Sequence, residues 1–288
     1  MGRFWGLPLL ACAACEATIE GAPLGGIDGS TGTGLGAWSS PMLVMGANTG
    51  IDEDDATPTA SVLEMIFSYA DPNDNNRKHL YAMTRSSPQD MWSAPLALPF
   101  NATGSTDQTP RLSADGLTLF FASNRDPNTN GLDVWRVTRP SVGAAWGTPE
   151  EIVELVAAND DDKWFAPCAN GRYLMISQRG GGEDIYEGVL GAGAPVRVAE
   201  LSSSSGETGT WISADCTLAY FASTRSNANR IYTASRPTAG APWSAPTLVE
   251  DFLALGGDQE DPWISPDRRT FVFVSDASGS KDVYLSTR

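Results

Sequence analysis

The feature that most constrains this chain is a sequence repeat with a period near fifty residues. Segments 110–116, 210–216 and 262–268 share a Ser-x-Asp pattern that directly follows Leu or Ile. A weaker copy spans 165–171, and the first repeat has Pro58-Thr59-Ala60-Ser61 and then skips the turn. The matching positions are 61, 113, 168, 213 and 265, which lie 52, 55, 45 and 52 residues apart. This spacing is typical of a β-propeller, in which each repeat builds one blade.

Each repeat contains the same succession of strand signals. The Asp-Gly end of the motif suits a tight reversal, and an apolar strand follows it at 117–123, 173–177, 218–223 and 271–275. A third strand opens with Asp, an aliphatic residue and an aromatic one at 133–135, 184–186 and 282–284, and a fourth opens with Trp-x-x-Pro at 92–95, 146–149 and 243–246. The 29 glycines and 19 prolines also favour short strands joined by turns. We therefore predict an all-β domain, a five-bladed propeller of four-stranded blades, over residues 37–288.

The last blade lacks its own fourth strand. Arginines at positions 85, 139 and 236 end a third strand, and a tryptophan follows each of them seven residues later. The equivalent arginine of the last repeat is Arg288, where the sequence stops. Trp38-Ser39-Ser40-Pro41 carries the fourth-strand motif without a blade before it. We expect this N-terminal strand to complete the last blade and close the ring.

These motifs resemble the TolB-type, WD-like propeller repeat of bacterial envelope proteins. The resemblance rests on the Ser-x-Asp-Gly turn, on Ser-x-Arg after the second strand and on Asp-Ile-Tyr in the third, and it covers about residues 37–288. It implies the propeller fold. It does not by itself imply one function, because this repeat serves scaffolds, binding proteins and the side domains of peptidases.

The N-terminus is expected to be a targeting segment. Residues 1–15 place one arginine before a short apolar run that ends in small residues and cysteine, which resembles a bacterial lipoprotein signal with Cys12 or Cys15 as the lipidated residue. Residues 16–36 are rich in Gly, Ser and Thr and are expected to form a flexible tether. We expect a lipid-anchored protein of the bacterial cell envelope, in the periplasm or at the outer membrane or surface. The alternative is an unstructured apolar stub.

The charge and the histidine content exclude some functions. The formal charge is −16, which repels phosphate backbones and argues against a nucleic-acid partner. The only histidine, His79, cannot form a multi-histidine zinc site, and we interpret it as a surface residue. Solubility, cationic ligands and metal ions remain as explanations of the negative charge.

A row of acidic residues is expected on the innermost strands. Three residues before the proline position of each repeat stand Asp55, Asp107, Asp162 and Glu207, with Gln259 in the last repeat. Equivalent positions of a propeller lie at equal depth, so these side chains would form a ring at one mouth of the channel. Such oxygen ligands suit Ca²⁺, the one cofactor considered; a solvated rim, or hydrogen bonds between blades, is the alternative.

Other repeated residues have a structural interpretation. Trp211 and Trp263 lie four residues beyond the acidic row, with Arg111 at the same place in the second repeat, and they could contact a ligand or pack between blades. Arginines after the second strand are expected to pair with the aspartates that open the third strand; they are Arg125, Arg179 and Arg225, and the aspartates are Asp133 and Asp184.

Two cysteines occupy the turn motifs of adjacent repeats. Cys168 takes the serine position in the third repeat and Cys216 the glycine position in the fourth. A disulfide between them is compatible with an exported protein. Two independent buried thiols are the alternative.

The sequence contains no strong catalytic motif. The leading hypothesis is a monomeric, non-catalytic binding or scaffold propeller whose ligand is an envelope protein, a peptide or a glycan. The second hypothesis is a glycoside hydrolase of the five-bladed type. It would use Asp55, Asp107, Asp162 and Glu207 as base, orienting group and acid.

Overall fold

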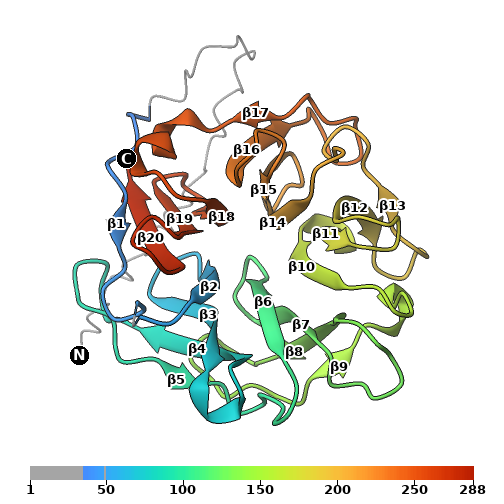
Figure 1. The fold of residues 1–288 in the computed structure, drawn as a ribbon, viewed down its shortest axis with the longest axis horizontal. Coiled ribbons are helices and arrows are strands. Elements are labelled where there is room, and N and C mark those ends of the chain that lie inside the picture. Colours follow the sequence, from blue (N-terminus) through green and yellow to red (C-terminus); the bar gives the residue numbers. More distant parts are fainter. Residues whose placement is uncertain (1–34, 49) are drawn as a thin grey trace, which may run out of the picture. The chain divides into compact units, whose positions relative to one another are not determined.

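The chain folds into a five-bladed β-propeller, as expected. The structure, a computed structural model, describes residues 35–48 and 50–288, and residues 36–288 form one compact unit. Within the described residues, five four-stranded antiparallel sheets surround a common axis (Figure 1). The predicted signal and nearly all of the predicted tether, residues 1–34, lie outside the described part of the chain.

Each blade runs outward from an innermost strand at the axis. Blade 1 consists of β2 (Glu53–Pro58), β3 (Glu64–Asp71), β4 (Arg77–Thr84) and β5 (Leu96–Ala97). Blade 2 consists of β6 (Asp107–Leu112), β7 (Thr118–Ser123), β8 (Asp133–Thr138) and β9 (Glu150–Glu151). Blade 3 consists of β10 (Asp162–Pro167), β11 (Arg172–Ser177), β12 (Asp184–Val189) and β13 (Val196–Arg197). Blade 4 consists of β14 (Glu207–Ile212), β15 (Leu218–Ser223), β16 (Arg230–Ser235) and β17 (Thr247–Leu248). Blade 5 consists of β18 (Gln259–Ile264), β19 (Thr270–Ser275), β20 (Asp282–Thr287) and β1 (Met42–Leu43).

Helical structure is confined to short connections. The described 3-10 helices are η1 (Pro72–Asp74), η2 (Val153–Leu155), η3 (Ala169–Gly171) and η4 (Glu250–Leu255). None of the helices in residues 35–48 and 50–288 has the length and apolar character needed to cross a bilayer.

The last blade is closed by the N-terminal strand, which confirms the prediction. β1 pairs with β20 through Met42 opposite Leu285 and Leu43 opposite Tyr284. The Arg288 guanidinium stacks on the Trp38 ring at 4.1 Å. The same stack recurs at 4.1–4.4 Å in blades 1, 2 and 4, where the pairs are Arg85–Trp92, Arg139–Trp146 and Arg236–Trp243. The motif that predicted the closure therefore also holds it by cation–π contact.

Every innermost strand is bulged at the same place. The pairing register shifts after the second residue of each strand, and the third residue has a positive φ of 47–61°. These third residues are Asp55, Thr109, Trp164, Gly209 and Asp261. Glu53, which pairs with Tyr69 as Asp107 pairs with Ser123, is therefore the blade-1 equivalent of Asp107. The expected place of Asp55 in the acidic row is wrong by two residues.

Blade 1 also has the turn that its sequence was expected to skip. The amide of Thr59 donates to the Glu64 carbonyl and the amide of Val62 to the Thr59 carbonyl, each at 2.8 Å. The corresponding bonds in blade 2 join Ser113 to Thr118 and Gly116 to Ser113, also at 2.8 Å. Val62 occupies the glycine position with φ 54°. The turn therefore forms without the Asp-Gly sequence by which it was recognised in other repeats.

Neighbouring blades are joined by apolar clusters and by specific bonds. Cys168 and Cys216 form a disulfide between the turns of blades 3 and 4, with their Cα atoms 5.5 Å apart. Arg236 of blade 4 donates two hydrogen bonds of 2.9 Å to Glu187 of blade 3. Arg139 of blade 2 likewise grips Glu64 of blade 1 at 2.6 and 2.8 Å. These bidentate pairs, of which Arg139–Glu64 is buried and Arg236–Glu187 partly buried, tie neighbouring blades together.

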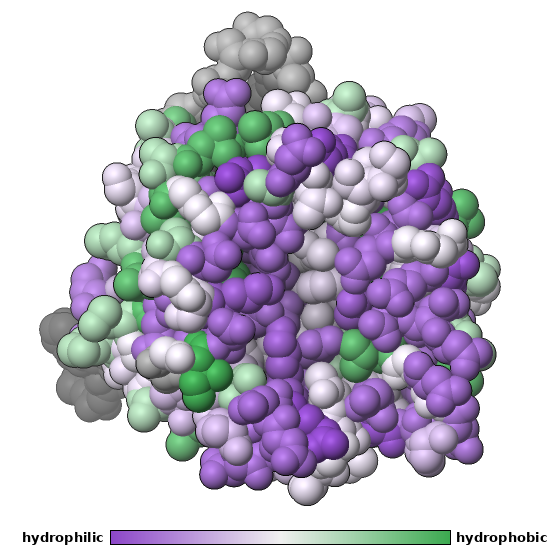
Figure 2. All heavy atoms as spheres, in the orientation of Figure 1, coloured by the Kyte–Doolittle hydropathy of each residue, from purple (hydrophilic) through white to green (hydrophobic). Residues whose placement is uncertain are grey.

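The surface is mostly hydrophilic. Figure 2 shows hydrophilic residues over most of the viewed face, with hydrophobic ones more frequent on its left side, where Figure 1 places β1. Met42 and Met45 in and beside this strand are 65% and 69% exposed. Leu43, next to Met42, is also exposed, at 41%.

Candidate functional site

The carboxylates that begin the inner strands are bonded within their own blades. Asp107, Asp162 and Glu207 are fully buried. Their oxygens lie 2.6, 2.8 and 3.0 Å from the guanidinium groups of the arginines after the second strand, Arg125, Arg179 and Arg225. Each guanidinium also lies over aromatic rings of its blade at 4.9–5.5 Å. The acidic row is therefore a set of structural ion pairs.

The expected partners of these arginines are bonded elsewhere. Asp133 accepts a hydrogen bond from Thr129 at 2.6 Å, and Asp184 pairs with Arg197 at 2.7 Å. Burial raises the pKa of Asp133 in spite of the Thr129 bond. In blade 5 the row holds neutral Gln259, which donates to the Phe252 carbonyl at 2.7 Å. These arginines pair with the acids that begin the inner strands, and not with the aspartates that open the third strands. The innermost carboxylates are the most buried and therefore most need a compensating charge.

Asp55 reaches across the axis from blade 1 to blade 3. Its carboxylate accepts hydrogen bonds from the Trp164 indole and the Ser68 hydroxyl, each at 2.8 Å, and from the Thr109 amide at 3.1 Å. The left-handed bulge turns this side chain toward the axis, and Asp55 is 1% exposed. A fully bonded, buried carboxylate of this kind has no place for a metal ion or a substrate.

Arg111 makes a second connection across the axis, from blade 2 to blade 4. Its Nε donates to the Thr210 carbonyl at 2.9 Å, and the Thr210 hydroxyl donates to the Trp164 carbonyl at 2.6 Å. Arg111 is 2% exposed, so it does not contact ligand as the sequence had suggested it could. We call Asp55, Arg111, Trp164 and Thr210 the axial plug, because their bonds link four blades across the centre of the ring.

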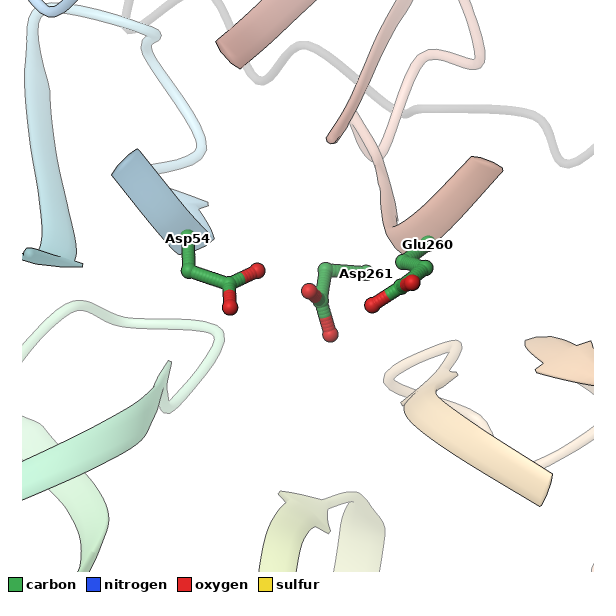
Figure 3. Close-up of side chains that lie close together, drawn as sticks. All are labelled: Asp54, Glu260 and Asp261. Carbon is green, nitrogen blue, oxygen red and sulfur yellow. The ribbon is translucent and has the colours of Figure 1, made fainter. Parts of the chain in front are cut away.

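A cluster of three acids lies beside the plug, where blade 5 meets blade 1. Asp54, Glu260 and Asp261 point toward one another from β2 and β18 (Figure 3), with an oxygen of each within 4.8 Å of the others. Lys281 bridges two of them, at 2.8 Å from Glu260 and 3.3 Å from Asp54, and Lys78 lies 2.5 Å from Asp54. The sequence analysis missed this cluster, although the acidic run at 52–55 could have indicated it.

The cluster fits ammonium groups and a proton better than a metal ion. Burial would raise the pKa of Asp54, but Lys78 and Lys281 outweigh it and hold that pKa well below its usual range. Burial, followed by the charges of Asp55 and Asp54, raises the pKa of Asp261 well above its usual range, despite Arg111 at 3.8 Å. The raised pKa of Asp261 favours its neutral form beside Asp54, and a divalent cation would compete with the side chains of Lys78, Lys281 and Arg111.

The four residues expected to bind Ca²⁺ or to catalyse glycoside hydrolysis do not form one site. Asp107, Asp162 and Glu207 each pair with an arginine inside a separate blade, and Asp55 is bonded within the axial plug. Acid and base residues of a glycosidase flank an open substrate cleft, whereas these four are 0–1% exposed. The geometry gives no support to either role.

A cavity does open at the other end of the axis, where the inner strands finish. It measures about 300 Å³ and receives residues from all five innermost strands or their turns. Two residues singled out from the sequence, Trp211 and Trp263, line it together, while Arg111 does not. Its apolar wall consists of Pro58, Leu112, Pro167, Ile212, Leu218 and Ile264. We call this cavity the axial pocket.

The polar atoms around the axial pocket are mostly engaged in the turns. The Ser113, Ser213 and Ser265 hydroxyls donate to the aspartates two residues later at 2.5–2.6 Å. Asp215 also accepts bonds from the amide and hydroxyl of Thr217. Arg268, in contrast, lines the pocket as an exposed residue. A charged residue at the glycine position of a turn was the signal that sequence reasoning overlooked.

Comparison with solved structures agrees with this architecture. A protein described as TolB from Agrobacterium tumefaciens superposes with a TM-score of 0.53 at 15% identity, over 83% of this chain and 78% of that one. The present chain therefore has a TolB-type β-propeller fold. TolB from Acinetobacter baumannii gives a TM-score of 0.50 at 14% identity, over 83% of this chain and 55% of that one. No protein-family model and no curated protein matches the sequence. At these identities the TolB likeness concerns the fold alone.

Proposed function

We propose that this propeller is a non-catalytic binding module whose ligand enters the axial pocket. The observation that carries the proposal is the pocket itself, an apolar cavity of about 300 Å³ lined by two tryptophans at the centre of one face. Concave apolar sites with a few polar groups are the usual form of ligand pockets. The channel carboxylates support binding over catalysis, because each of Asp107, Asp162 and Glu207 is neutralised by its own arginine.

Among the ligand classes considered, a protein segment or peptide fits the wall best. A glycan needs many hydrogen-bonding groups around its hydroxyls, whereas the serine hydroxyls at this pocket already donate to aspartates. Leu112, Ile212 and Ile264 offer apolar surface instead. An aliphatic or aromatic side chain of a partner would bury its area there.

Peptide selection tests this function. Random peptides displayed on phage should yield binders to the purified protein, and Trp211→Ala should weaken them by about tenfold or more, since buried aromatics dominate binding energy. Met91→Ala, which alters an 82% exposed apolar residue outside the pocket, is the matched control. Equal loss in both variants, or none in either, would reject the pocket as the binding site.

We further propose that the propeller is tethered to the bacterial envelope, with residues 1–15 as a lipoprotein-like signal and 16–36 as the tether. The sequence around Cys12 and Cys15 supports the signal. The disulfide between Cys168 and Cys216 supports maturation in an oxidising compartment. Changing both Cys12 and Cys15 to serine should release the protein from the membrane fraction of a bacterial host, and unchanged fractionation would reject lipidation.

A further inference from the structure

Arg268 occupies a position that an arginine adopts only at a cost. It stands at the glycine position of the blade-5 turn with φ 58°, where blade 2 has Gly116 at φ 70°. A residue with a Cβ loses about 1 kcal/mol or more in this left-handed conformation. The equivalent positions of blades 1 and 4 hold Val62 and Cys216 at φ 54° and 60°, so the conformation belongs to the turn, and what distinguishes Arg268 is its charge.

The guanidinium of Arg268 is also left without a close partner. Among residues 35–48 and 50–288, its side chain makes no hydrogen bond and no ion pair within 4.0 Å, and of the described arginines only Arg269 shares this property. Burial raises the pKa of Asp215, the bonds from Ser213 and Thr217 outweigh it, and the charge of Arg268 contributes last to the net lowering. Because Arg268 lines the axial pocket and Arg269 does not, a cation is presented beside the apolar wall.

The axial pocket is a blind hole. Beyond it the axial plug crosses the centre through the Asp55–Trp164 and Arg111–Thr210 bonds at 2.8 and 2.9 Å. A polypeptide therefore cannot thread the ring, and a chain that enters along the axis must end there. A volume of about 300 Å³ suits one large side chain with its terminal group.

We propose that the axial pocket binds the C-terminal end of a partner polypeptide, with an apolar last side chain between Trp211 and Trp263 and its α-carboxylate on Arg268. This inference rests on the proposed binding function and names its ligand class. A guanidinium pairs with a carboxylate through charge-assisted hydrogen bonds. Asp215, the other charged residue of the lining, already accepts bonds from Ser213 and Thr217. Because Asp215 is already hydrogen-bonded, Arg268 is the charged group of the lining that an anionic chain end would meet.

The test uses synthetic peptides of the form acetyl-Gly-Ser-Gly-X, with X as Phe, Trp, Leu or Val, in free-acid and C-terminal amide forms. A third form places an internal Asp after X and ends in an amide. Dissociation constants are measured by fluorescence anisotropy on the intact protein. We expect the free acid to bind about tenfold more tightly than either amide form, the equivalent of one charge-assisted bond at an accessible site.

Arg268→Gly is the informative variant because glycine fits the turn and keeps it folded. It should remove the difference between acid and amide, whereas Arg269→Ala, which changes the net charge equally, should keep it. If acid and amide bind wild type equally while Trp211→Ala abolishes binding, recognition of the chain end is wrong and the binding function stands. Equal binding of the internal-Asp form would likewise overturn the chain-end proposal. If no peptide binds, or Trp211→Ala has no effect, the proposed function fails as well.

Discussion

The two ends of the propeller axis use charge in opposite ways. Where the inner strands begin, Asp107, Asp162 and Glu207 are buried and paired with arginines of their own blades. Where the strands finish, the wall is apolar, and among the described residues Arg268 lines it without a close ionic partner. The end with more charge is thus the one with less capacity to bind a ligand. The conspicuous acidic residues near the channel form structural ion pairs, whereas Arg268 belongs to the proposed binding site.

The largest effect should follow from breaking a pair at the charged end. Arg125→Ala leaves the fully buried Asp107 without its 2.6 Å partner, and an uncompensated buried charge costs about 3–5 kcal/mol of unfolding free energy. Arg136→Ala is the control, because its pair with Glu150 is exposed and worth about 1 kcal/mol at most. Urea denaturation measures both losses. Similar values for the two variants would mean that the row does not act as buried ion pairs.

The next effect concerns the scaffold of the pocket end. The Cys168–Cys216 disulfide closes a loop with a sequence separation of 48, for which chain entropy gives a stabilisation of about 3–4 kcal/mol. Replacing both cysteines with serine should lower the free energy of unfolding by that amount, and a reductant should then have no further effect. A count of two free thiols in denatured, unreduced protein would show instead that the bridge does not form.

A rise in pH should destabilise the charged end through Asp261. The native pKa of Asp261 is raised by burial and by Asp55 and Asp54, so its stabilising contribution is complete at acid pH and disappears as pH rises through the native pKa. The loss accumulates at about 1.4 kcal/mol for each pH unit between the usual carboxyl pKa and the raised native pKa, and stability changes no further above it. Asp261→Asn should flatten the stability profile in this range, as measured by urea denaturation at several pH values. A wild-type profile as flat as that of the variant would contradict the raised pKa of Asp261.

The smallest effect is expected at the turns of the pocket end, and it has the opposite sign. The Ser265 hydroxyl, more than the Arg269 amide, lowers the pKa of Asp267. The associated stability is present above the usual carboxyl pKa and is lost as pH falls through the lowered native value. Ser265→Ala should raise the pKa of Asp267 in an NMR titration, because it removes the hydroxyl that donates to this carboxylate at 2.5 Å. An unchanged titration would show that this hydroxyl does not hold the carboxylate.

Most of the fold could be predicted because the same motifs recur at a regular spacing, and this spacing corresponds to one blade. The fourth-strand motif at Trp38 and the missing fourth strand after Arg288 together specified the closure that β1 makes with β20. The register of blade 1 could not be predicted in the same way. Pro58 appeared to match Pro110, but the bulge residues Asp55, Thr109, Trp164, Gly209 and Asp261 share only a backbone conformation, and their side chains have no common pattern.

The candidate site was less predictable than the fold. Trp211 and Trp263 were identified because they recur at one strand position, and the structure brings both into the axial pocket. The acidic row also recurred, but its pairing depends on burial across a sheet. Ser123 lies opposite both Asp107 and Asp133, so sequence distance could not decide which aspartate Arg125 contacts. Arg268 broke the repeat, and a search for shared residues passes over such a position.

The most direct test of this account is hydrogen–deuterium exchange with and without the tightest free-acid peptide. Binding at the axial pocket should protect amides in segments 112–116, 211–216 and 263–268, where the inner strands finish and the turns begin. Exchange at the other end, in segments 53–55 and 259–261, should stay as it is in the free protein. Protection at the strand starts together with unchanged turns would show that the charged end is the binding site and would contradict the account.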